Sequence, residues 1–145
     1  MIVDVEERFS NALHNTARAW RLAVDHRLKH LGLSQASWMT IAVVARAPSP
    51  LSQSEIASRL AVEGATIVSM IDRLAKSGLV IRETSLTDRR IKHVCLTDAG
   101  DNLYAKVKRE ALAVRQQLLA NLDREKLRLA TELLEELQGI LESLP

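Results

Sequence analysis

Residues 82–98 read RETSLTDRRIKHVCLTD, and this stretch decides the fold of the chain. Two short runs of strand-forming residues, 79–82 and 91–96, flank a polar tip with an Asp-Arg-Arg run at residues 88–90. Because charged side chains are not buried without partners, this tip must face water or another molecule. The stretch therefore predicts a β-hairpin with a cationic tip.

A helix–turn–helix pattern precedes the hairpin. Residues 52–55 (SQSE) form a capping box, with a serine that can cap a helix and a glutamate three residues later, and open a short helix to Leu60. A turn over residues 61–64 leads to a second helix over residues 65–77, which Gly78 should end in the left-handed conformation. A recognition helix followed by a basic hairpin is a winged helix, whose physical partner is duplex DNA.

The second helix of this pair is predicted to have an apolar side and a polar side. The apolar side, expected to pack inward, consists of Ile67, Val68, Ile71 and Leu74. The residues expected to contact DNA are Ser54, Gly64, Ala65, Thr66, Ser69, Met70, Arg73, Asp88, Arg89 and Arg90. In the wing, Asp88 should hold the Arg90 guanidinium extended toward the minor groove, while Arg89 should reach a phosphate.

Amphipathic helices are predicted on both sides of this region. They are expected at residues 4–31, 35–46, 98–122 and from 123 onward, with Gly32 as a stop and Ser34, Thr97 and Asp123 at their starts. The apolar stripes of the long helices are larger than the central module can cover, which indicates a partner subunit.

The predicted fold is therefore mainly α with a small β-wing. We expect a single domain over residues 1–145, in which a winged helix–turn–helix at 34–97 is flanked by dimerisation helices at 3–33 and 98–145. Aromatic residues make up only 3% of the chain, which favours helices packed through aliphatic side chains over a β-sandwich.

Charge, cysteine content, the length of apolar runs and the absence of catalytic motifs limit the classes of protein to which the chain can belong. The formal net charge is +2, and the segment from Arg82 to His93, with four basic and two acidic residues, carries as much by itself. Cys95 is the single cysteine, so no intrachain disulfide can form, and with no signal peptide this predicts a cytoplasmic protein. The longest apolar run, residues 41–45, is too short for a membrane span. No catalytic constellation or phosphate-binding loop is found, so we expect neither an enzyme nor a cofactor.

The sequence resembles the MarR family of transcriptional regulators over nearly its whole length. The matching segments are 51–57 (LSQSEIA), 72–80 (DRLAKSGLV), 88–90 (DRR) and 96–100 (LTDAG), while 20–28 (WRLAVDHRL) and 34–38 (SQASW) resemble its SlyA branch. The resemblance implies a winged-helix homodimer with intertwined terminal helices, a pseudo-palindromic operator and, often, release from DNA by small anionic aromatic compounds. Ser69 stands where SlyA-type recognition helices tend to carry arginine.

The resemblance also suggests a ligand site. In SlyA-like proteins, the positions matching Arg18, Arg21 and Trp38 fall near a cavity between the dimerisation region and the DNA-binding module. Two guanidinium groups and an aromatic face could bind a carboxylate on a ring. The alternative is that both arginines are surface charges and Trp38 fills the core.

Other readings of the chain remain. His26 and His30 have a spacing that can hold a metal, but no third ligand accompanies them, so no metal site is expected. Cys95 is expected to be an ordinary thiol, because peroxide-sensing relatives use an N-terminal cysteine.

The alternative function is a helical module that dimerises or docks a protein without binding DNA. Such a module has no need for the charged run at residues 88–90.

Overall fold

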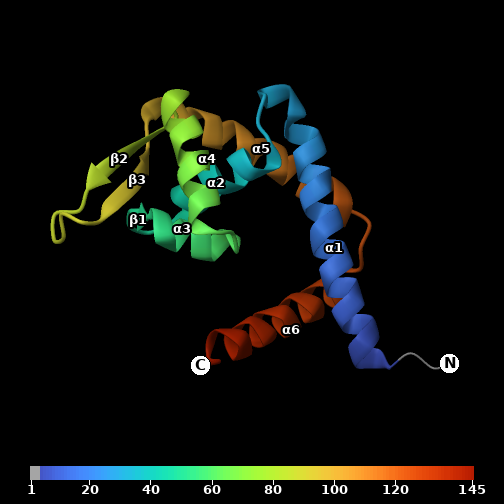
Figure 1. Ribbon diagram of the computed structural model, residues 1–145. Helices are drawn as coiled ribbons and strands as arrows, with labels where there is room; N and C mark the ends of the chain where they lie inside the picture. The colour runs from blue at the N-terminus through green and yellow to red at the C-terminus, as the bar shows by residue number, and fades with distance from the viewer. Residues whose placement is uncertain (1–3) are drawn as a thin grey trace. The chain divides into compact units, whose positions relative to one another are not determined.

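The structure, a computed structural model, describes residues 4–145. It is mostly helical with one small antiparallel sheet, as predicted (Figure 1). The chain divides into two compact units, one extending to Leu112 and the other comprising Ala113–Pro145. None of the helices found in residues 4–145 has the length and hydropathy needed to cross a bilayer.

Four helices begin the first unit, and local sequence signals explain where each one starts. They are α1 (Val5–Leu28), α2 (Gln35–Arg46), α3 (Gln53–Leu60) and α4 (Gly64–Lys76). Ser34 caps α2, because its Oγ accepts the backbone N–H of Ser37 at 3.2 Å. Ser52 and Glu55 form both hydrogen bonds of the capping box at α3. These predicted caps are confirmed.

Two glycines end helical segments as predicted. Gly32 follows the 3-10 turn Lys29–Leu31 with a φ of 72°. Gly78 follows α4 with a φ of 77°. Both lie in the left-handed region that side chains with a Cβ rarely adopt, which is why glycine ends each segment.

The sheet has three strands rather than the two that the sequence predicted. They are β1 (Leu51–Ser52), β2 (Val80–Thr84) and β3 (Lys92–Leu96), in the order β1-β3-β2. The β2–β3 hairpin is the wing, and it runs in register from Val80 opposite Leu96 to Thr84 opposite Lys92. β1 has only two residues before α3 begins, so it shows no alternating pattern that could predict it.

One hydrophobic core joins the sheet to α2, α3 and α4. Ile41 of α2, Ile56 of α3, Ile71 of α4 and Val94 of β3 are all fully buried. Because α4, which corresponds to the predicted recognition helix, shares this core with the wing, the side chains of both are held on one rigid support.

α5 (Asp98–Leu119) starts against the turn that follows α4. The Thr97 hydroxyl donates to the carbonyl of Gly78 at 2.6 Å and accepts the N–H of Gly100 at 3.1 Å, so the predicted cap is confirmed. Gly100 is buried, and a Cβ at this position would overlap the carbonyl oxygen of Leu79. The glycine of the LTDAG segment therefore allows a close backbone contact.

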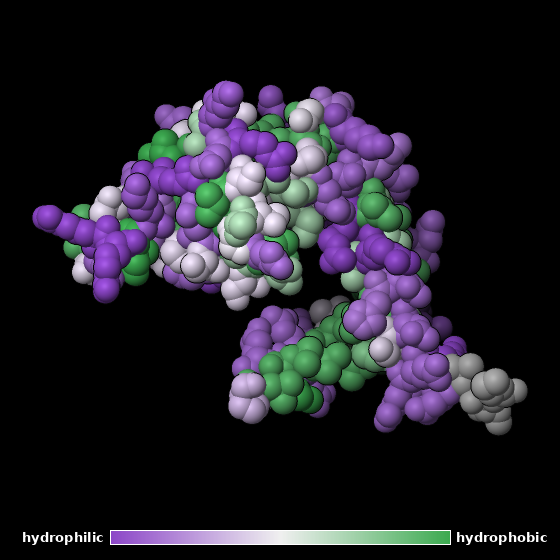
Figure 2. All heavy atoms as spheres, viewed as in Figure 1, coloured by the Kyte–Doolittle hydropathy of each residue, from purple (hydrophilic) through white to green (hydrophobic). Residues whose placement is uncertain are grey.

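The second unit contains the end of α5 and helix α6 (Arg124–Glu142). Asp123 caps α6 as predicted, since its Oδ1 accepts the N–H of Lys126 at 2.8 Å. None of the described residues of α6 is buried in the single chain. Its exposed apolar side chains form the α6 stripe, which runs along the helix in Figure 2; its members are Leu129, Leu133, Leu134, Ile140 and Leu141.

Candidate nucleic-acid interface

α4 has a buried side that differs from the prediction at one pair of residues. Ile67, Met70, Ile71 and Leu74 are buried, following the i, i+3, i+4, i+7 spacing of one helical face. Met70 is only 3% exposed, so its predicted place on the DNA-facing side is wrong. Val68, predicted to be in the core, is 41% exposed instead. Hydrophobicity alone favoured valine for the core, whereas the helical period places the methionine there.

The other predicted contact residues of α4 lie on its surface. Gly64, Ala65, Thr66, Ser69 and Arg73 are all exposed. Small side chains near the start of a helix permit close approach to a groove, and the first N–H groups of a helix favour phosphate. The exposed side of α4 can therefore enter a major groove with Arg73 reaching a base edge or a phosphate.

The start of α3 lies beside the end of the wing loop and the first residue of β3. A cavity of about 430 Å³ is lined by Ser52, Gln53, Ser54, Arg90, Ile91 and Lys92. Ser54 and Arg90, both predicted to contact DNA, therefore line one surface. Two cations and two serine hydroxyls at the N-terminal end of a helix suit the backbone of a nucleic acid.

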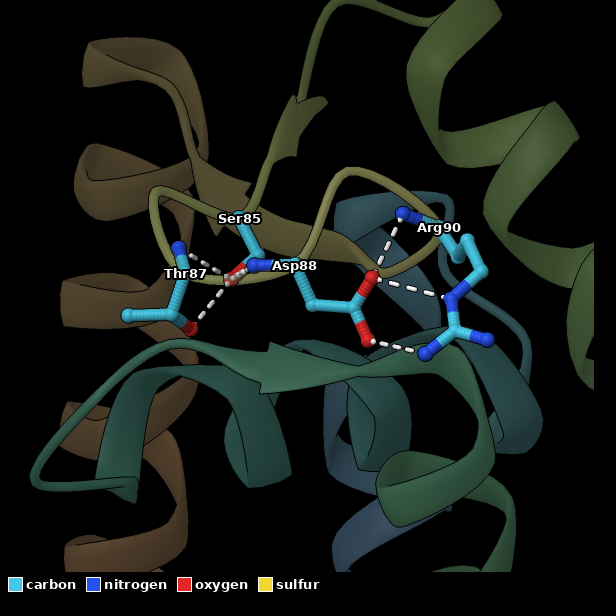
Figure 3. A network of polar contacts seen from close by, with 4 residues as sticks. All are labelled: Ser85, Thr87, Asp88 and Arg90. Atoms are coloured by element: carbon cyan, nitrogen blue, oxygen red, sulfur yellow. Dashed lines mark hydrogen bonds and ion pairs between the residues drawn. The ribbon is translucent and has the colours of Figure 1, made fainter.

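At the tip of the wing, Asp88 holds Arg90 through three hydrogen bonds (Figure 3). The Arg90 guanidinium donates to the two carboxylate oxygens, each at 3.1 Å, and the Arg90 backbone N–H donates to Oδ1 at 3.0 Å. These bonds lower the pKa of Asp88 below its ordinary value. The Arg90 side chain remains 90% exposed, so it is oriented and still accessible to a partner.

A second network, which the sequence analysis did not predict, shapes the loop before Asp88. The Ser85 hydroxyl accepts the N–H groups of Thr87 and Asp88 at 3.2 and 3.3 Å and lies 3.1 Å from the Thr87 hydroxyl (Figure 3). The N–H of Ser85 donates to the carbonyl of Ile91 across the loop at 2.9 Å. A serine in a polar loop is a signal for such a turn, because its hydroxyl can accept the backbone N–H groups of the next few residues. The turn presents Asp88 and Arg90 in a fixed arrangement.

Arg82 has a different place from the other cations of the wing. Its Nε donates to Oε1 of Gln53 at 2.7 Å, and its Nη2 donates to Oδ1 of Asp72 at 2.6 Å. The guanidinium therefore binds α3 and α4 rather than extending from the hairpin. The exposed positive charge of the wing comes from Arg89, Arg90 and Lys92.

Comparison with known proteins identifies the family of this winged helix. The sequence profile of the MarR family matches residues 31–91. The crystal structure of transcriptional regulator PA3341 is 38% identical, with 94% of this chain and 99% of that chain covered and a TM-score of 0.85. The chain belongs to the MarR family. It is a MarR-family transcriptional regulator, and members of this family are not enzymes.

Two other solved structures share the MarR-family fold at lower identity. CouR from Rhodococcus jostii RHA1, bound to p-coumaroyl-CoA, is 20% identical with a TM-score of 0.81, and 99% of each chain is covered. A single-residue mutant of S. aureus MepR, bound to an oligodeoxyribonucleotide, is 22% identical with a TM-score of 0.61, covering 92% of this chain and 97% of that chain.

In this MarR-family chain a second cavity, of about 420 Å³, touches the recognition helix. It is lined by Arg21, Gln35, Ala36, Met39, Thr40, Leu60, Ala61, Val62, Thr66, Ile67 and Met70. Of the three predicted ligand residues, only Arg21 is among them. The Trp38 indole N–H donates to Asp25 at 3.2 Å, and the Arg18 guanidinium donates to Asn15 at 3.4 Å. Arg18 and Trp38 do not line this cavity, and each has a partner on α1 instead.

His30 and Cys95 each lie beside a polar partner in the described part of this MarR-family chain. Within residues 4–145, no three metal-ligating side chains gather in one place. Nδ1 of His30 lies 2.8 Å from the carbonyl oxygen of Arg27. Partial burial, followed by the nearby Glu83 carboxylate, raises the pKa of the Cys95 thiol. A raised pKa disfavours the reactive thiolate.

Proposed function

We propose that this regulator binds duplex DNA as a homodimer on a pseudo-palindromic operator. The observation that carries the proposal is the wing tip, where Asp88 orients an almost fully exposed Arg90. An oriented guanidinium at a projecting tip suits the narrow, negative minor groove. The small exposed residues of α4, in the same unit as the wing, are suited to entering a major groove.

Individual contacts follow from exposure and chemistry. Ser69 and Arg73 would read base edges, with Gly64, Ala65 and Thr66 allowing close approach. Ser54, Arg89 and Lys92 would hold the DNA backbone. Val68, which the sequence analysis placed in the core, is exposed and would pack against a thymine methyl group.

The homodimer is supported by apolar surface that the single chain leaves uncovered. Leu133, Leu134 and Leu141 in the α6 stripe are 52%, 42% and 57% exposed. Full burial of such a side chain contributes roughly 1.5–3 kcal/mol, so several together favour a tightly associated second copy. A dimer would present two recognition helices related by a two-fold axis, as a pseudo-palindrome requires.

Release from DNA by a small anionic aromatic ligand is the second part of the proposal. The cavity beside α4 has mainly apolar walls, with the Arg21 side chain among its lining. Thr66, Ile67 and Met70 of the recognition helix also line it, so a bound molecule would contact that helix directly. A ligand that fits one orientation of α4 better than another would shift DNA affinity.

We also propose that the chain belongs to the SlyA-like branch of the MarR family and that it acts in the cytoplasm. Residues 20–28 and 34–38 support a place in the SlyA-like branch, although Ser69 departs from that pattern. A cytoplasmic location agrees with a single cysteine and with a DNA partner.

The proposal is tested by selecting bound sequences from a pool of random duplex DNA with the purified protein of residues 1–145. We expect enrichment of one motif with two-fold symmetry. A protein-docking module that does not bind DNA would enrich nothing, and that outcome would contradict the proposal.

A further inference from the structure

Among the described residues of the wing, Arg82 is the one whose guanidinium hydrogen-bonds to side chains of both α3 and α4. Gln53 belongs to α3, Asp72 belongs to α4, and Arg82 itself lies in β2. Its Nη2 also lies 3.4 Å from the carbonyl oxygen of Val68. Three elements of the first unit therefore meet at a single planar group with fixed donor directions.

The partners leave Arg82 poorly placed to bind a phosphate. Its side chain is 25% exposed, against 90% for Arg90 at the tip. Its Nε and Nη2 already donate at 2.7 and 2.6 Å. A phosphate would have to compete with a carboxylate that is already in place.

Asp72 gives this arrangement an unusual electrostatic character. Its carboxylate is 61% exposed on α4, the helix proposed to enter the major groove. An acidic group on that surface repels phosphates, and by itself it would weaken DNA binding. An aspartate at this position favours DNA binding only if its bond to Arg82 strengthens the complex by more than its repulsion of phosphates weakens it.

We propose that Arg82 is a positioning residue, which fixes the wing against the recognition helix through Asp72 and Gln53 and does not itself contact DNA. This inference rests on the proposed DNA binding. The wing and α4 must reach two features of one duplex together, so a loose angle between them lowers affinity for every sequence.

The test compares four variants of the 145-residue chain by measuring operator affinity over a range of salt concentrations. They are Arg82→Ala, Asp72→Asn, the double variant, and Arg89→Ala as a control at an exposed wing arginine. Each lost phosphate contact lowers the slope of log affinity against log salt by about 0.9. A lost positioning bond lowers affinity without changing that slope.

We expect Arg82→Ala and Asp72→Asn each to weaken binding by about ten-fold with the wild-type slope. The double variant should be no weaker than Arg82→Ala, because the two residues act through one bond. Arg89→Ala should weaken binding and reduce the slope. The thermal melting temperature of each variant is measured in parallel, and affinities are compared only at temperatures at which every variant is folded.

Three results would overturn the positioning role. A reduced slope for Arg82→Ala would show a phosphate contact, and tighter binding by Asp72→Asn would show that simple repulsion dominates. Lower melting temperatures with unchanged affinity would show a role in folding alone. If Arg82→Ala does not fold, Asp72→Asn and Arg82→Lys carry the same test, because lysine cannot serve Gln53 and Asp72 together. Wild-type protein that binds no duplex would instead contradict the proposed function.

Discussion

The Asp88 carboxylate and the Arg90 guanidinium form a two-point contact at the tip of the wing, with both hydrogen bonds at 3.1 Å. The contact lies in solvent and contributes little to folding. Its consequence is geometric, because it selects one direction for a long and otherwise mobile cation.

Arg90→Ala should therefore weaken DNA binding without unfolding the protein. We expect a loss of about 1–3 kcal/mol of binding free energy, and a change in the free energy of unfolding within about 0.5 kcal/mol. Asp88→Ala should cause a smaller loss, since the arginine remains but is less ordered. Binding titrations together with thermal melting measure both quantities, and wild-type affinity in the Arg90 variant would refute the role of the wing.

The depressed pKa of Asp88 gives a prediction for pH. Because the folded pKa lies below the ordinary value, the contact is fully present above that ordinary value and is lost only as pH falls through the folded pKa. Near pH 7 the contact should be insensitive to pH. An NMR titration should find a higher Asp88 pKa in Arg90→Ala than in wild type, and equal values would contradict the contact.

The α6 stripe predicts an obligate dimer. Leu141→Asp should place a charge in the interface and shift the protein toward monomer or unfolded chain, abolishing DNA binding although the wing is unchanged. Gln138→Asp places the same charge at an exposed polar position of α6 and should leave the dimer intact. Sedimentation velocity reports the difference, and a stable Leu141→Asp monomer with normal DNA binding would argue against this assignment.

The cavity beside α4 predicts a ligand effect that depends on one arginine and not on its neighbour. Salicylate-like aromatic carboxylates should bind the wild type and weaken its DNA binding, whereas Arg21→Ala should lose about ten-fold or more in ligand affinity. Arg18→Ala, which removes an arginine outside the cavity, should bind as the wild type does. Calorimetry with and without operator DNA should show reciprocal coupling. Binding that is undetectable at millimolar ligand, or equal in both variants, would make the cavity structural.

The sequence predicted the elements of the fold well because their signals are local. Ser34, Thr97 and Asp123 each accept the backbone N–H of the residue three positions later, so a short window of sequence contains the whole capping bond. Gly32 and Gly78 mark left-handed turns, because a positive φ depends on the identity of the single residue that adopts it. The Asp-Arg-Arg run likewise contains the entire wing contact.

Features that depend on residues distant in sequence were not predictable in the same way. Arg82 was counted only as one of the four basic residues of the wing segment, and its partners Gln53 and Asp72 could not be foreseen because folding alone brings them near. The error at Met70 and Val68 has a local origin, because the predicted apolar side did not follow the i, i+3, i+4, i+7 spacing of the buried face of α4. Arg18 and Trp38 turn to partners along α1, which a motif position does not reveal.

The central claim is that a homodimer reads a two-fold DNA site with paired recognition helices. Hydroxyl-radical footprinting on a selected operator, with the stoichiometry of the same complex measured by sedimentation, tests this most directly. Two protected half-sites about 10 bp apart, bound by two chains, are the expected result. Protection of a single half-site by one chain would contradict it.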